Sequence, residues 1–221
     1  MKIRSLFAVA AVLLFAAGCD KVTDPSASDK PTLAAVSISL PAANFSDTCN
    51  APAYSYAASA QALIQLATAY ANPALGTSVN GVWTWSITQD GVTATMTARR
   101  LDDGRYSWKL VLNGTEAGSG GTVYTNWTAF EATSSADGKS GTLSIYDDSP
   151  TPSTTVDVIV TWSTGASNAV TINVEFVQEN MKFVLVSNGT TGEVTSYTKV
   201  ASTWVQEFHA SWTAPGALAT C

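Results

Sequence analysis

Residues 82–112 read VWTWSITQDGVTATMTARRLDDGRYSWKLVL, and the pattern in this stretch decides the fold. Apolar residues alternate with Thr, Ser and charged residues, and this period of two is typical of half-buried β-strands. Asp90-Gly91 is a strong signal for a β-hairpin turn, and residues 102–104 carry a second turn sequence. The stretch therefore predicts three consecutive strands joined by short turns.

The same alternation continues to the end of the chain. It predicts further strands at 122–132, 142–146, 155–162, 170–177, 181–186, 194–200 and 203–212. Short connections make neighbouring strands pair antiparallel, which gives a meander of about ten strands. Because the open edges of a long twisted sheet are a liability, we expect the sheet to form a barrel or a curved half-barrel.

Before this region the apolar period is helical. Asn50 and Pro52 are suited to the start of a helix over residues 52–71, and Asn72-Pro73 is suited to its end. Apolar residues recur at spacings of three and four, so they share one face: Tyr56, Ala60, Leu63, Ala67 and Tyr70. We therefore expect a mainly β fold (α+β) with one N-terminal helix packed on the sheet. Residues 33–40 predict one additional strand.

The tryptophans suggest what this sheet holds. Alternation gathers most of them on one apolar face, whereas Thr and charged residues occupy the other. The candidate residues of this face are Trp83, Trp85, Trp108, Trp127, Trp162, Trp204 and Phe208. Either the face is a core filled by the helix, or part of it lines a cavity for a lipid or another apolar ligand.

This expected architecture resembles the lipoprotein carriers of the LolA and LppX kind, in which a curved antiparallel sheet wraps helices and shelters acyl chains. The resemblance covers residues 33–213 and is architectural. These carriers generally use more helix than this chain offers, and no family motif matches residue by residue. The resemblance implies a sheltered apolar ligand, and it carries over no site residue.

The first residues, MKIRSLFAVAAVLLFAAGC, resemble the signal peptide and lipobox of bacterial lipoproteins. Lys2 and Arg4 precede an uncharged apolar run, and small residues lead into Cys19. Ala16 departs from the family, which prefers leucine there. The resemblance implies cleavage before Cys19 and attachment of lipid to its thiol. Ordinary secretion with cleavage near Gly18 and an uncleaved anchor are the alternatives, and both also export the chain.

These features divide the chain into a signal peptide (1–18), a polar flexible tether (19–32) and a single β-rich domain (33–221). We expect the domain to be held in the cell envelope, outside the cytoplasm, by the lipid on Cys19. The outer membrane and the periplasmic face of a membrane both remain open.

Charge and cysteine content narrow the function further. The chain has 11 basic and 17 acidic residues, and removal of Lys2 and Arg4 with the signal leaves 9 and 17, a net charge of −8. This acidic surface disfavours nucleic acid as a partner. After lipidation of Cys19, an even pair remains, Cys49 and Cys221, which predicts a disulfide in an exported protein. Two free thiols are the alternative.

The sequence offers no catalytic constellation. The one histidine, His209, lies near Glu207 on the polar face, and there is no G-x-S-x-G motif and no cluster of metal ligands. We therefore expect a non-enzymatic envelope lipoprotein without cofactor or metal, binding an apolar ligand or lipid. The alternative is a structural or surface-interaction role, including carbohydrate binding, which would require tryptophans on the outer face or in loops.

Overall fold

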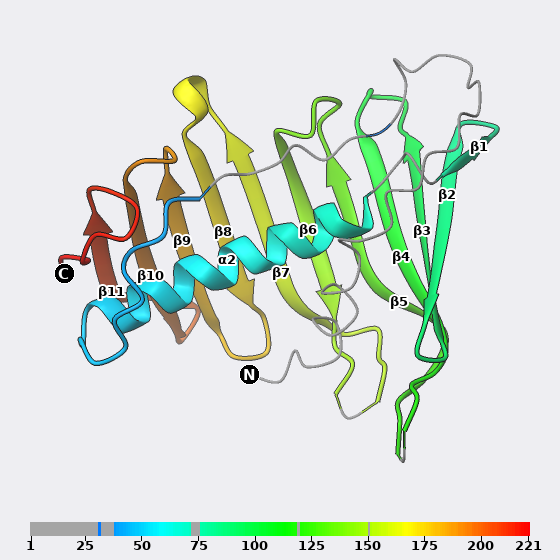
Figure 1. The fold of residues 1–221 in the computed structure, drawn as a ribbon, viewed down its shortest axis with the longest axis horizontal. Helices are drawn as coiled ribbons and strands as arrows, with labels where there is room; N and C mark the ends of the chain where they lie inside the picture. The colour runs from blue at the N-terminus through cyan, green and yellow to red at the C-terminus, as the bar shows by residue number, and fades with distance from the viewer. Residues whose placement is uncertain (1–30, 32–37, 72–75, 119, 150) are drawn as a thin grey trace.

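The structure is a computed structural model that describes residues 31, 38–71, 76–118, 120–149 and 151–221. Within these residues, eleven strands form one antiparallel sheet whose spatial order is the order of the chain (Figure 1). The strands are β1 (Thr77–Val79), β2 (Val82–Gln89), β3 (Val92–Arg100), β4 (Tyr106–Thr115), β5 (Val123–Ser134), β6 (Ser140–Tyr146), β7 (Val156–Thr164), β8 (Val170–Phe176), β9 (Met181–Ser187), β10 (Gly192–Val200) and β11 (Thr203–Trp212).

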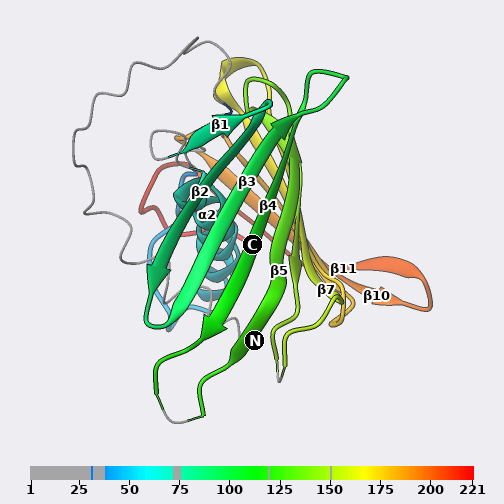
Figure 2. The ribbon, with the colours of Figure 1, turned by 90° about the vertical axis from the view of Figure 1, so that its right-hand side faces the viewer.

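One long helix, α2 (Asn50–Tyr70), crosses a single face of this sheet diagonally (Figure 1). The sheet curves round the side on which the helix lies (Figure 2), and we call this side the concave face and the other the outer face. A short 3-10 helix, η4 (Ala166–Asn168), connects β7 to β8. The prediction of a mainly β meander with one packed helix is thus confirmed.

Of the two predicted forms, a barrel and a curved half-barrel, the closed barrel is wrong. The first and last strands, β1 and β11, do not pair with each other, so the sheet is open. Both edges are protected in other ways. β1 has only three residues, and the C-terminal tail covers the end of β11, where Ser211 and Thr220 exchange backbone hydrogen bonds of 2.9 and 2.8 Å. Short and covered edges lessen the need for closure.

The ten strands predicted after Gly81 are all present, with small shifts at their ends. β1 is an addition, joined to β2 by Asn80-Gly81, whose φ angles of 51° and 75° are the left-handed values of a tight hairpin turn. The strand predicted at 33–40 is not seen at residues 38–40, and its other residues lie outside the described chain.

The helix begins two residues before the predicted range, and the predicted cap by Asn50 is wrong. Asp47 performs this role, because its Oδ1 accepts hydrogen bonds from the backbone N–H groups of Cys49 (2.9 Å) and Asn50 (2.7 Å). The Asn50 side chain instead joins two distant segments. It donates to the Ala42 carbonyl and accepts from the Ala219 N–H (2.8 Å).

The core lies between α2 and the concave face. The predicted helical stripe is confirmed, since four of its residues are buried and Tyr56 is half-buried. The Tyr56 ring packs against Phe183 and Phe208, with centroid separations of 5.0 and 6.1 Å. At the other end of the helix, the Trp85 indole N–H donates to the Tyr70 carbonyl. These contacts fix both ends of α2 on the sheet.

The predicted disulfide is confirmed. The sulfur atoms of Cys49 and Cys221 are 2.08 Å apart and their α-carbons 5.8 Å apart. The bond fastens the last residue to the start of α2, beside the covered edge of β11.

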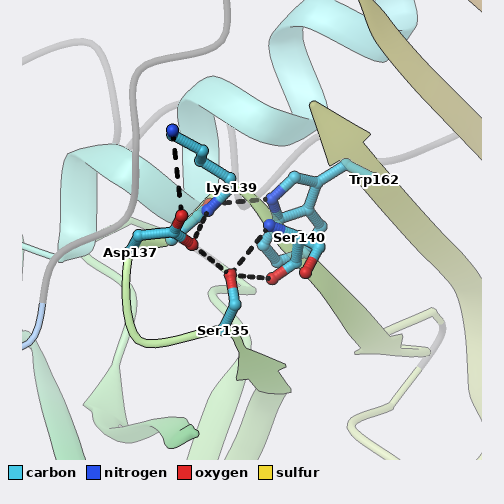
Figure 3. Close-up of polar contacts among 6 residues, drawn as sticks. Ser135, Asp137, Lys139, Ser140 and Trp162 are labelled. Carbon is cyan, nitrogen blue, oxygen red and sulfur yellow. Dashed lines mark hydrogen bonds and ion pairs between the residues drawn. The ribbon is translucent and has the colours of Figure 1, made fainter. Parts of the chain in front are cut away.

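The β5–β6 turn shows how a buried tryptophan fixes a hairpin (Figure 3). Asp137 Oδ1 accepts hydrogen bonds from the Ser135 hydroxyl (2.7 Å) and from the Lys139 backbone N–H (3.1 Å). From β7, the Trp162 indole N–H donates to the Gly138 carbonyl at 3.1 Å. The Asp137-Gly138 turn is therefore held by hydrogen bonds from both the solvent side and the core.

Candidate functional site

Five of the seven residues of the predicted ligand face lie in the packed core: Trp83, Trp85, Trp108, Trp127 and Trp162, each with an exposed fraction of 6% or less. The indole N–H groups of Trp85, Trp108, Trp127 and Trp162 all donate hydrogen bonds inside the protein. Trp108 donates to Ser134 Oγ at 2.9 Å and Trp127 to the Ser153 carbonyl at 2.8 Å. Phe208 is half-buried beneath Tyr56. These aromatics form the layer on which α2 rests.

Alternation predicts that Trp204 lies on the same face as Phe208. The structure places it on the opposite face from Phe208 and Trp212. The register between β10 and β11 shifts between Ser196 and Tyr197, so one extra residue of β11 stands between Phe208 and Gln206. Such a β-bulge reverses which face the following residues occupy. Trp204 is therefore on the outer face, where it pairs with Lys199 and lies under the Lys182 ammonium.

Two grooves lie on the outer face. The smaller, of about 440 Å³, runs across β2 to β6 and is lined by Val82, Thr97, Ala98, Arg99, Ser107, Trp108, Lys109, Glu131, Ala132, Thr133, Thr142 and Ser144. The larger, of about 940 Å³, lies between the β4–β5 hairpin and the β6–β7 loop. Its lining comprises Lys109, Gly120, Gly121, Thr122, Val123, Thr125, Asn126, Trp127, Thr128, Glu131, Tyr146, Thr151, Pro152, Ser153 and Thr154.

The two grooves meet at one ion pair. Lys109 and Glu131 line both, and Lys109 Nζ is 3.0 Å from Glu131 Oε1. The Tyr146 hydroxyl donates to Glu131 Oε2 at 3.0 Å. All three side chains remain partly accessible, with exposed fractions of 46% and 45% for Lys109 and Glu131. The centre of the combined groove thus presents a cation, an anion and a phenol together.

Electrostatics keep this cluster charged. The hydrogen bond from Lys109 lowers the pKa of Glu131 below its ordinary value, and the hydrogen bond from Tyr146 acts in the same direction against partial burial. Burial and the Glu131 carboxylate raise the pKa of Tyr146. At neutral pH the carboxylate is therefore ionised and the phenol protonated.

The larger groove lies beside the first half of β5, which extends beyond the end of the neighbouring strand β6. β5 pairs with β6 only from Phe130 onward, so the first half of β5 has no strand partner on that side. The β6–β7 loop fills part of this space, and Ser153 ties it to Trp127. The Trp127 ring also stacks on Tyr124 with centroids 5.3 Å apart. Asn126, at φ 47°, accepts a hydrogen bond from Asn113 at 2.7 Å.

The lining of the two grooves mixes polar and apolar residues. Glu131 is the only carboxylate among the described residues that line them. The described residues contain no group of three or more His, Cys, Asp or Glu side chains arranged to hold a metal ion. Hydroxyl, amide and charged groups alternate in the lining with apolar surface, which makes up at least half of the exposed area and comes from aliphatic, aromatic and proline residues and threonine methyl groups.

The remaining predicted residues lie elsewhere. His209 is exposed on β11, and its Nδ1 lies 3.1 Å from Thr195 Oγ1. Cys19, the signal peptide and most of the tether lie outside the described residues. Neither described helix has the length and apolarity that a membrane crossing requires. Comparison of the chain with protein-family models, with curated proteins and with solved structures gave no match.

Proposed function

We propose that this protein is a non-enzymatic cell-envelope lipoprotein, held by lipid on Cys19, whose domain binds a saccharide in the outer-face grooves. The observation that carries the proposal is the junction of the two grooves at Lys109 and Glu131, with Tyr146 beside them. The anchor rests on the lipobox resemblance of residues 1–19.

The groove chemistry matches a polyhydroxylated ligand. A sugar hydroxyl both donates and accepts, so its receptor needs donors and acceptors side by side. Lys109 and the Asn126 amide supply donors, Glu131 supplies an acceptor, and threonine and serine hydroxyls supply both. Tyr146 and Pro152 add apolar surface for the C–H faces of a sugar ring. A fatty acid would leave most of these polar groups unsatisfied.

Carriage of a lipid on the concave face is the less supported alternative. The aromatic residues there are buried, and α2 packs on them. A lipid would therefore have to displace the helix, together with the contacts of Tyr56 and Tyr70. Both grooves are lined mainly by outer-face side chains and by the β4–β5 and β6–β7 connections, although the core residues Trp108 and Trp127 also contribute to the lining.

The test is binding to an array of oligosaccharides by the chain from Asp20 onward, which contains all described residues, followed by calorimetry on the glycans that bind. Glu131→Gln keeps an oxygen for Tyr146 but removes the charge. We expect it to weaken binding by about tenfold, since a hydrogen bond to a charged group contributes about 1.5–3 kcal/mol.

Asp137→Asn is the matched control, because Asp137 also contacts a lysine at 3.9 Å and lies outside both grooves. Its affinity should equal that of the wild type. Failure of every glycan to bind would refute the proposal, as would equal binding by Glu131→Gln. Co-purified lipid in native mass spectra of the protein from its own host would instead support the concave-face alternative.

A further inference from the structure

The β10–β11 hairpin extends beyond the rest of the sheet (Figure 2). β9 pairs with β10 only as far as Thr198, so the hairpin tip has no neighbouring strand on that side. Two aliphatic side chains stand exposed on it, Val200 (55%) and Val205 (44%). These are among the few large apolar residues that the described chain leaves in solvent.

Two lysines gather beside this tip. Lys182 Nζ lies 4.6 Å from the ring centroid of Trp204 and 5.1 Å from that of Tyr197, and Lys199 Nζ lies 5.5 Å from Trp204. Lys182 lies on the outer face, because its neighbour in β9, Phe183, is buried on the concave face and successive residues of a strand alternate between the two faces. We call these four residues, Lys182, Tyr197, Lys199 and Trp204, the hairpin patch. Val200 pairs with Thr203 and Val205 pairs with Thr198, so the two valines lie on the opposite face of the same hairpin tip.

Neither lysine of the hairpin patch forms an ion pair within the described chain, although Glu175 is the cross-strand neighbour of Lys182. Among the described residues, Arg105, Lys109 and Lys139 form ion pairs with carboxylates, whereas Lys182 and Lys199 form none. Both lysines contact aromatic rings, which attract a cation without cancelling its charge. The patch therefore presents two ammonium groups on a protein with an excess of acidic residues.

A hairpin tip with basic and aromatic residues on one face and aliphatic residues on the other matches one kind of surface. Anionic headgroups attract lysines near a bilayer, tryptophan and tyrosine favour the level of the headgroups, and exposed aliphatic side chains enter the acyl boundary. We propose that the hairpin patch docks on an anionic lipid surface. A stacked sugar fits less well, since the Lys182 ammonium already lies over the Trp204 ring.

This contact is separate from the saccharide grooves, which are lined by β2–β6, the β4–β5 hairpin and the β6–β7 loop. It is also independent of the lipid on Cys19, although an anchor would hold the patch near a membrane. The chain from Asp20 onward therefore tests the docking surface alone, and its failure would leave the groove proposal untouched.

The experiment is sedimentation with vesicles of phosphatidylcholine containing half phosphatidylglycerol, compared with pure phosphatidylcholine, at about 20 mM salt. We expect binding to the anionic vesicles only, and its loss at about 0.5 M salt. Lys182→Glu with Lys199→Glu should weaken it at least about tenfold. Brominated lipid should quench Trp204 fluorescence, which a Trp204→Phe variant identifies by its loss.

Arg105→Glu with Lys139→Glu is the matched control. It makes the same change in net charge at two exposed residues outside the patch, and it should bind as the wild type does. Lys182→Arg with Lys199→Arg should retain binding and shows that charge reversal, not misfolding, causes the loss. Equal loss in both charge-reversed variants, no quenching by brominated lipid, or binding to an anionic polysaccharide but not to vesicles would each overturn the proposal.

Discussion

The indole ring of Trp212 occupies the space above Gly192, its partner across β10 and β11. A Cβ atom at position 192 would lie 2.1 Å from Trp212 Cζ2, which is closer than non-bonded atoms approach. The same indole donates to Ser39 Oγ at 3.0 Å, and the Ser39 N–H donates to Ser187 Oγ at 2.9 Å. Gly192 therefore makes room for the ring that ties the edge strand to the segment preceding α2.

Gly192→Ala should lower the free energy of unfolding by about 1–3 kcal/mol, because the ring must move and overpacking of a core costs this much. Urea denaturation measures the change. Gly165→Ala is the control, since a Cβ there would meet nothing closer than 3.8 Å and its φ of −88° suits alanine. Equal stability of the two variants would show that Trp212 has free space to move.

The placement of Trp204 gives a second prediction. Six tryptophans have exposed fractions of 6% or less, whereas Trp204 is half-buried on the outer face. We expect acrylamide to quench a minor part of the fluorescence, and Trp204→Phe to remove most of that part. If the variant keeps the full quenchable component, another tryptophan is accessible to acrylamide and Trp204 is not the exposed one.

Trp204 also marks how far sequence can predict this fold. The period of two and the Asp-Gly turns were enough for ten strands and their order, because each depends on local residues. A β-bulge depends on how two strands align, and the one opposite Ser196 and Tyr197 reverses the face of Trp204. No residue type in that segment of the sequence predicts the bulge.

The groove junction at Lys109 and Glu131 could not be predicted from the sequence, because it too depends on how strands align. Alternation along residues 105–112 places Lys109 on the polar face, but its pairing with Glu131 depends on the register of β4 against β5. That register shifts twice, at Leu110 and at Leu112. The groove further requires β6 to stop pairing at Phe130. Only the disulfide could be predicted over a long distance, because the count of cysteines left a single pairing.

Tyr70 predicts how stability changes in alkali. Burial raises the pKa of its phenol from 10.0 to about 12. Between these values the unfolded chain releases the proton while the folded chain keeps it, so the folded state binds more protons and stability falls as pH rises. The loss should approach about 2–3 kcal/mol, at about 1.4 kcal/mol for each pKa unit.

Tyr70→Phe isolates this contribution, because it keeps the ring and removes the titrating group. Urea denaturation from about pH 9 to pH 12 should show a steeper loss of stability in the wild type than in the variant. The remaining tyrosines and the lysines titrate in both proteins and cancel in the difference. Parallel curves would mean that the phenol reaches water in the folded state.

The bond between Cys49 and Cys221 gives the last prediction. It closes a loop with a sequence separation of 172 residues, so it restricts the unfolded chain strongly. Cys49→Ser with Cys221→Ser should therefore lower the melting temperature and reduce the free energy of unfolding by about 2–5 kcal/mol. In the folded state, hydrogen bonds from Ala219 to Asn50 and between Gly216 and Leu40 also hold the tail, so β content by circular dichroism should stay unchanged.

Reduction of the disulfide should destabilise the wild type and leave the double variant unaffected. Two alkylatable thiols at these positions in protein taken from its own host would show that the bond does not form there.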